Sequence, residues 1–149
     1  MIRMSRKIAL ALEAVLDIAY NGRPNPVQSK DITERQGIPQ RYLEQVLQQL
    51  VRNDILKGVR GPRGGYVLAR ERRKITLGDV LRVVNNMDGE EDVGASQAQL
   101  GDKVICPIWD DVQADILKKF DTITMEDLCR DAESKGVMRA GEDAVTFTI

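Results

Sequence analysis

The residues best placed to do chemistry in this chain are two arginines set among glycines in segment 59–68. The segment reads Val-Arg-Gly-Pro-Arg-Gly-Gly-Tyr-Val-Leu, which places Arg60 and Arg63 in a tight turn between two short apolar runs. Glycines beside an arginine let the backbone approach a phosphate closely and let the guanidinium enter a narrow minor groove. The pattern therefore predicts a contact with DNA, while a hairpin with solvated arginines is the simpler alternative. A nucleotide phosphate loop is disfavoured because the turn joins two strands and lacks a Gly-Lys-Ser/Thr ending.

The segment just before the turn is expected to form a helix from Pro39 to about Asn53. Its apolar residues recur at i, i+3, i+4, i+7 and i+8, at Leu43, Val46, Leu47, Leu50 and Val51. Arg, Gln and Glu have hydrogen-bonding groups that match base edges in the major groove. We predict that Arg41, Glu44 and Gln45 read bases, and that Gln48 and Arg52 lie further along and reach the DNA backbone. An ordinary solvated helix face would have a similar composition.

Three predicted helices and one hairpin position these side chains. Besides the helix above, we expect helices at about 5–20 and 30–36 and a hairpin of Ile55-Leu56 with Tyr66-Val67-Leu68. Ser29 is expected to be the N-cap of the second helix, and Gly37 its C-terminal stop. Two helices joined by a short glycine-containing turn are typical of a helix-turn-helix. A basic hairpin directly after them predicts a winged helix.

The second half of the chain predicts more helix. Thr76 and Asp79 form a capping-box pattern at the start of a fourth helix, and Thr124 and Asp127 form another before a short helix ending near Ala132. Between them we expect a mobile loop over 85–104 and a long helix over 106–120. The tail, 144–149, is β-prone.

The long helix carries a wide apolar face that allows two interpretations. The face comprises Ile105, Ile108, Trp109, Val112, Ile116, Leu117 and Phe120, and the opposite face is acidic, with Asp110, Asp111 and Asp115. The apolar face could pack into the core of its own domain or pair with a second copy. We favour pairing, because helix-turn-helix repressors are normally two-fold dimers on repeated half-sites.

Charge is divided unevenly between the two halves. Residues 1–74 contain 15 Lys and Arg and 7 Asp and Glu, whereas residues 75–149 contain 7 and 16, although the whole chain has a net charge of only −1. Such asymmetry favours a first half that faces nucleic acid. Two oppositely charged but merely solvated faces are the alternative.

Composition excludes several classes of function. The 149 residues are 42% hydrophobic, contain no histidine and have only two cysteines. Without histidine, the chain lacks the usual general base and the commonest zinc ligand, so we do not expect an enzyme. Two cysteines are too few for a disulfide framework. No run of about 18 apolar residues is present, so we expect no membrane partner and a cytoplasmic location.

With these motifs in place, the chain resembles the IscR-type regulators of the Rrf-two family of bacterial winged-helix transcription factors. The resemblance rests on segments 32–38, 42–45 and 59–66, and it resumes at 102–128, where Trp109 and 123–128 resemble the dimer helix and its end. It implies a homodimer with paired winged helices and crossed long helices. By position, Arg41, Glu44 and Gln45 match the base-reading places and Arg60 matches the wing residue that enters the minor groove. Arg41 stands where a small serine is usual, which affects the operator sequence.

The resemblance fails at the cluster ligands. Cluster-binding members place three cysteines between the fourth helix and the dimer helix, whereas no cysteine precedes Cys106 here. Iron–sulfur clusters need about four ligands, mostly thiolates. Carboxylates in the region are poor substitutes, namely Glu90, Glu91, Asp92 and Asp102. No cofactor is therefore expected, with an iron–sulfur cluster as the alternative.

The two cysteines have different expected roles. Cys106 begins a helix, where a thiolate is stabilised, so it is either a redox or persulfide sensor or simply a small residue at a helix start. Cys129 lies in an apolar pattern and is expected in the core.

The predicted protein is mainly α-helical, a winged helix-turn-helix DNA-binding domain followed by a long dimerisation helix. Its expected parts are a DNA-binding domain over 1–86, a flexible loop over 87–104, a dimerisation and capping unit over 105–133, and a tail over 134–149. We predict a homodimeric, sequence-specific transcription regulator of a double-stranded operator, with repression favoured over activation. The alternatives are a sensor whose DNA binding is switched through Cys106, and a winged-helix adaptor for protein contacts.

Overall fold

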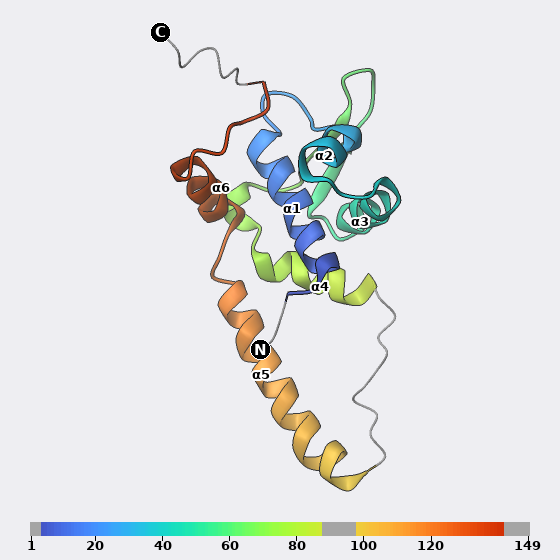
Figure 1. Ribbon diagram of the computed structural model, residues 1–149, viewed down its shortest axis with the longest axis vertical. Helices are drawn as coiled ribbons and strands as arrows, with labels where there is room; N and C mark the ends of the chain where they lie inside the picture. The colour runs from blue at the N-terminus through green and yellow to red at the C-terminus, as the bar shows by residue number, and fades with distance from the viewer. Residues whose placement is uncertain (1–3, 88–97, 142–149) are drawn as a thin grey trace.

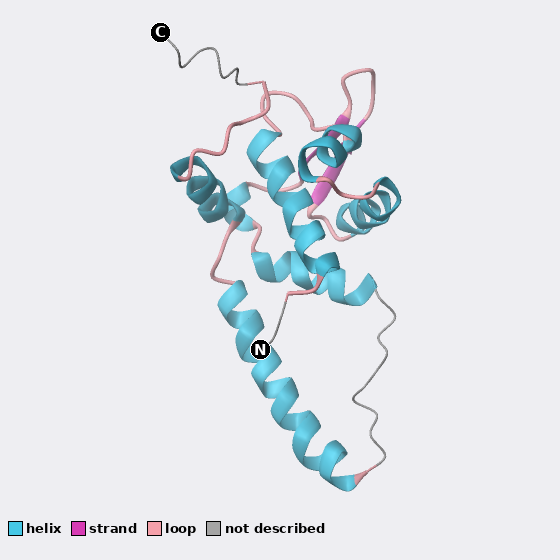
Figure 2. Cartoon of the chain, viewed as in Figure 1, coloured by secondary structure: helices cyan, strands magenta, loops and turns pink. Residues whose placement is uncertain are grey.

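The protein folds into a small helical body from which one long helix extends (Figure 1). The computed structural model describes residues 4–87 and 98–141. Its elements are α1 (Arg6–Asn21), α2 (Ser29–Gln36), α3 (Gln40–Arg52), β1 (Leu56–Val59), β2 (Gly65–Leu68), η1 (Arg72–Lys74), α4 (Leu77–Met87), η2 (Gly101–Ile105), α5 (Cys106–Phe120) and α6 (Met125–Ser134). The mainly helical prediction is confirmed, and the hairpin is the two-stranded antiparallel sheet of Figure 2.

One apolar core unites the body. It is formed by the buried faces of α1, α3 and α4, by β1, and by the start of α6, where Met125 is fully buried. Leu43, Val46, Leu47 and Leu50 are all fully buried, so the helical spacing identified the inward face of α3 correctly. Val51, predicted on the same face, is only partly buried. Because Met125 enters this core and α6 contacts α1 and η1, α6 packs against the winged helix.

The helix ends follow the predicted chemistry with two corrections. Gly37 adopts a left-handed φ of 64° after α2, as expected of a glycine stop. The prediction of Ser29 as an N-cap was wrong. The helix begins one residue earlier, because the Gln28 carbonyl already accepts from the Asp31 and Ile32 amides, and Gln28 is the N-cap without a side-chain hydrogen bond. Pro39 is the N-cap of α3 and lies just before its first turn.

Both predicted capping boxes are present. Thr76 Oγ1 accepts from the Asp79 amide at 3.1 Å, while Asp79 Oδ2 accepts from the Thr76 amide at 3.0 Å. Thr124 and Asp127 repeat this arrangement at 3.1 and 3.0 Å. The hydrogen bond that the Thr124 amide donates to the Asp127 carboxylate lowers the pKa of that carboxyl. The helix α6 continues to Ser134, two residues beyond its predicted end.

The loop predicted over 85–104 was wrong at both ends. Residues 85–87 continue α4, where Met87 packs against the core, and η2 is a π-helical turn that leads directly into α5. The centre of that loop, 88–97, and the β-prone tail, 144–149, lie outside the described residues.

A buried carboxylate ties α1 to α2. Asp17 is 3% exposed, and within the described parts of the chain it is the one buried charged side chain. It accepts hydrogen bonds from Arg35 Nε at 2.9 Å and Nη2 at 2.8 Å, and from Gln36 Nε2 at 2.8 Å. The hydrogen bonds to Asp17 raise the pKa of the Arg35 guanidinium, and the three bonds together hold α2 against α1.

Candidate nucleic-acid interface

The outward face of α3 carries all five polar residues that the sequence predicted there. Their side chains are exposed, at Arg41, Glu44, Gln45, Gln48 and Arg52. The spacing i, i+3, i+4, i+7 and i+11 keeps them on one side of the helix, opposite the fully buried leucines. The structure therefore presents a continuous polar strip that is backed by a rigid core.

Two hydrogen bonds orient the first turn of this strip. Thr33 Oγ1 on α2 donates to Gln40 Oε1 at 2.9 Å, and Gln40 Nε2 donates to Glu44 Oε1 at 3.0 Å. The position of the Glu44 carboxylate is thus linked to α2 through Gln40. The sequence analysis gave Gln40 no role, although the i, i+4 spacing of Gln40 and Glu44 allows this contact.

The hairpin is the predicted wing. Its register pairs Leu56 with Leu68 and Val59 with Gly65, so residues 60–64 form the tip. Arg60 and Arg63 are both exposed at this tip. The Gly64 amide donates to the Gly61 carbonyl at 2.9 Å, which closes a compact turn.

The base of the wing is bound to the segment before α2. The Val27 amide donates to the Tyr66 carbonyl at 3.0 Å, and the Tyr66 amide donates to the Val27 carbonyl at 2.8 Å. A Cβ at Gly65 would overlap the Val27 carbonyl, so only glycine allows this approach. The sequence analysis missed this contact, because a single residue of bridge has no periodicity to detect.

The wing tip and the start of α2 lie side by side. Pro62 and Arg63 from the tip, Gln28 at the N-cap of α2 and Lys30 in α2 line one open hollow of about 360 Å³. Figure 1 shows α2, α3 and the hairpin together on one side of α1. The fold therefore brings the two helices of the helix-turn-helix and the hairpin onto a shared side of α1.

The α5 helix has no buried residue in the single chain. The apolar side chains of η2 and α5 are strongly exposed: Val104 46%, Ile105 60%, Ile108 58%, Trp109 56%, Val112 46% and Ile116 39%. Leu117 and Phe120, nearer the body, are half-buried. The interpretation of this face as core of its own domain is therefore wrong for its outer part. A contiguous exposed apolar stripe of this kind marks an interaction surface.

The two cysteines lie in different environments. Cys106, the first residue of α5, is partly exposed, whereas Cys129 on α6 is 1% exposed, as predicted. Burial raises the pKa of the Cys129 thiol, partly offset by the neighbouring Arg72 guanidinium. A raised thiol pKa favours the unreactive protonated form at neutral pH.

We expect a thiol reagent such as Ellman's reagent to modify about one thiol per chain quickly in the native protein. Cys129 should react only as fast as the protein unfolds, because its thiol is buried and protonated in the folded state. Cys106→Ser should remove the fast phase and Cys129→Ser should leave it. Fast modification of the one remaining thiol, Cys129, in Cys106→Ser would contradict this assignment.

The residues present do not fit a cluster held by three cysteines. The whole sequence supplies only Cys106 and Cys129, and the second is enclosed in the core. Among residues 4–87 and 98–141, no group of three or more His, Cys, Asp or Glu side chains could hold a metal ion. Within those ranges, no helix is both long and apolar enough to cross a membrane.

A helix-turn-helix with a basic wing defines a DNA-binding transcription regulator, and comparisons with known proteins agree. The family model for Rrf2, described as iron-dependent transcriptional regulators, matches residues 4–131, and the chain belongs to this family. The HTH-type transcriptional regulator IscR of Klebsiella pneumoniae is 35% identical over 133 residues, which are 88% of this chain and 82% of the relative. Thus the class is a transcription regulator, not an enzyme.

Solved structures show the same fold. The structure of T. potens IscR has a TM-score of 0.72 at 34% identity and covers 93% of both chains. CymR, the global cysteine regulator of B. subtilis, has a TM-score of 0.65 at 28% identity, covering 88% of this chain and 98% of its own. The predicted winged-helix fold and the family resemblance are confirmed.

Proposed function

We propose that this regulator acts as a homodimer that binds a two-half-site operator and represses transcription there. The observation that carries the proposal is the pairing of two surfaces: an exposed polar strip on α3 beside a basic wing, and an exposed apolar stripe on α5. The first suits a duplex groove and the second suits a second copy of this chain. Repression follows most directly, since a bound dimer occludes the DNA that it covers.

On this proposal the N-terminal half of α3 enters the major groove. Arg41, Glu44 and Gln45 lie on the exposed side of its first two turns and would meet base edges. Gln48 and Arg52 follow on the same side and would contact the backbone. Because Glu44 is held by Gln40, its carboxylate is preorganised to accept from a cytosine amino group.

The wing supplies the second set of contacts. Arg60 would enter the adjacent minor groove, and Arg63, beside Lys30, would neutralise phosphate. A glycine follows each arginine at the tip, Gly61 after Arg60 and Gly64 after Arg63. These residues would contribute mainly to affinity and to its salt dependence.

The dimer would form through α5. Its exposed stripe follows one side of the helix at 105, 108, 109, 112 and 116, which is the spacing of a helix that packs along a partner helix. An aromatic residue, Trp109, lies in the middle of the stripe, as is typical of interface centres. A second copy provides the same stripe and buries both.

The test is DNA binding by single variants, using duplexes selected by the wild-type protein from a random library. Arg60→Ala is expected to weaken binding roughly 5- to 100-fold and to lower the slope of log affinity against log salt by about 1. Glu44→Ala is expected to lose discrimination at one base position while the slope stays unchanged. Fluorescence anisotropy over a salt series measures both quantities.

A matched control is Arg130→Ala, which removes an exposed arginine on α6, away from the wing and α3. It should retain affinity and slope. If Arg60→Ala also retains both, and Glu44→Ala retains discrimination at every base position, the site assignment fails. If the wild type selects no duplex and shows no salt-dependent binding, an adaptor function replaces the proposal.

A thiol switch at Cys106 is a second candidate. Its side chain is partly exposed at the first residue of α5, so oxidation there would alter the proposed dimer helix at its outer end. Operator affinity measured before and after treatment with peroxide, in wild type and Cys106→Ser, distinguishes a switched from an unswitched regulator.

A further inference from the structure

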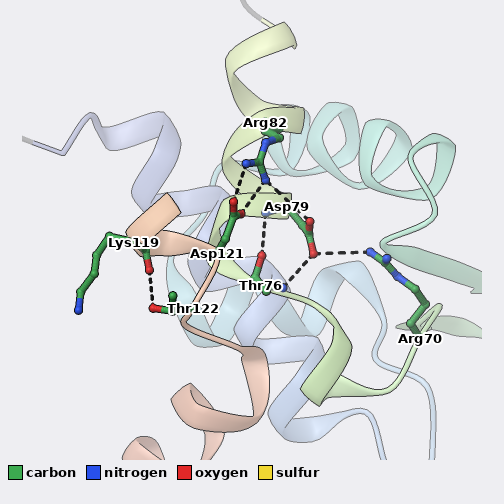
Figure 3. Close-up of polar contacts among 7 residues, drawn as sticks. All are labelled: Arg70, Thr76, Asp79, Arg82, Lys119, Asp121 and Thr122. Atoms are coloured by element: carbon green, nitrogen blue, oxygen red, sulfur yellow. Dashed lines mark hydrogen bonds and ion pairs between the residues drawn. The ribbon is translucent and has the colours of Figure 1, made fainter. Parts of the chain in front are cut away.

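A polar junction joins the end of α5 to α4 of the winged helix. The guanidinium of Arg82 on α4 donates from Nη1 to Asp121 Oδ1 and from Nη2 to Asp121 Oδ2, both at 2.7 Å (Figure 3). Asp121 is the C-cap residue of α5. Two parallel hydrogen bonds fix both the distance and the relative orientation of the two helices.

The backbone beside this pair is also bound across the junction. The Leu77 amide donates to the Ile123 carbonyl at 2.9 Å, and the Met125 amide donates to the Ile75 carbonyl at 2.8 Å. These bonds hold the chain after α5 against the start of α4. At the end of α5 itself, the Arg82–Asp121 pair adds a bidentate side-chain contact at the C-cap residue of the helix, beside the half-buried Leu117 and Phe120.

The local sequence is adapted to this close approach. A Cβ at Gly78 would overlap Asp121 Oδ1, so the absence of a side chain there admits the carboxylate. The hydrogen bond from Arg82 also holds the pKa of the Asp121 carboxyl below its ordinary value. The pair therefore stays charged across the neutral pH range.

The junction extends toward the wing through a shared carboxylate. Asp79 lies 4.0 Å from Arg82 Nη1 and 3.8 Å from Arg70 Nη2, between the two guanidiniums in Figure 3. Arg70 follows the end of β2 by two residues. A chain of charged groups thus connects the base of the wing, α4 and the end of α5.

Resting on the proposed dimer, we propose that Arg82 is a positioning residue that sets the distance between the two recognition helices, and so the operator half-site spacing that the protein accepts. The 15 residues of α5 span about 22 Å at about 1.5 Å per residue. A rotation of about 10° at the anchored end moves the other end by about 4 Å. That displacement is comparable with one base-pair step of about 3.4 Å.

The experiment measures binding to duplexes in which the spacer between two selected half-sites is shortened or lengthened by one or two base pairs. Wild type should prefer its selected spacing by roughly 10-fold or more. Arg82→Gln should reduce that preference to about 3-fold or less, while a single half-site is bound as well as by wild type. Asp121→Asn removes the same ion pair and should behave alike. The exchanged pair Arg82→Asp with Asp121→Arg should recover part of the preference.

Sedimentation of each variant checks that it remains dimeric, and Arg130→Gln serves as the matched arginine control. A purely structural role predicts lower thermal stability with an unchanged spacing profile, and that result in Arg82→Gln and Asp121→Asn would overturn the proposal. If wild type itself is monomeric or shows no preference for two half-sites, the proposed function fails instead.

Discussion

Trp109→Asp is expected to convert the proposed dimer into a monomer at micromolar concentration. Trp109 is 56% exposed in the single chain and lies at the centre of the apolar stripe of α5. A carboxylate buried there would lose the aromatic contact and lack a partner charge, which is expected to raise the dimer dissociation constant by roughly 100-fold or more. Sedimentation velocity over a concentration series measures this constant.

The same variant separates dimerisation from DNA contact. Affinity for a two-half-site duplex should fall sharply, whereas binding to one half-site should change little, because α3 and the wing are untouched. Ala114→Asp places an identical carboxylate on the opposite, exposed side of α5 and is the matched control. A Trp109→Asp protein that stays dimeric would show that another surface mediates assembly.

Asp17→Asn is expected to give the largest loss of stability from a conservative change. The amide has the size of the carboxylate, but its NH₂ group would face the donors of Arg35 and Gln36. The Arg35 side chain is 30% exposed and can turn toward water, so we expect a loss of about 2–3 kcal/mol, which is less than for a fully enclosed pair.

For a chain of this size such a loss lowers the melting temperature by roughly 6–10 °C at fixed protein concentration, measured by circular dichroism. Glu13→Gln removes an exposed carboxylate from the same helix and should leave the melting temperature nearly unchanged. Equal melting temperatures for Asp17→Asn and wild type would show that the network contributes no net stability.

Local patterns predicted most of the winged helix. The spacing of the α3 leucines, the glycine at 37 and the two Thr–Asp capping boxes each depend on interactions within a few residues, so their outcome was visible in the sequence. The exposed polar strip of α3 was predictable for the same reason, because identifying the residues on the buried face of a helix also identifies those on its exposed face.

Long-range contacts were not predictable in the same way. The bonds of Val27 to Tyr66 and of Arg82 to Asp121 join residues 39 apart in each case, and nothing in either local pattern identifies the partner. Asp17 illustrates the same limit, since its helix position gave no sign that Arg35 and Gln36 would enclose it. The loop boundary at 85–104 was wrong because a glycine-poor polar stretch can continue a helix when one residue, Met87, packs on the core.

The two backbone hydrogen bonds between Val27 and Tyr66 have a consequence for the position of the wing relative to the recognition helix. Since the wing is hydrogen-bonded to the chain that leads into α2, it cannot swing independently of the helix-turn-helix. On the proposed binding mode, Arg60 and the polar strip of α3 would therefore keep a constant separation along the duplex. Any bending or twisting needed to fit one half-site would then come from the DNA.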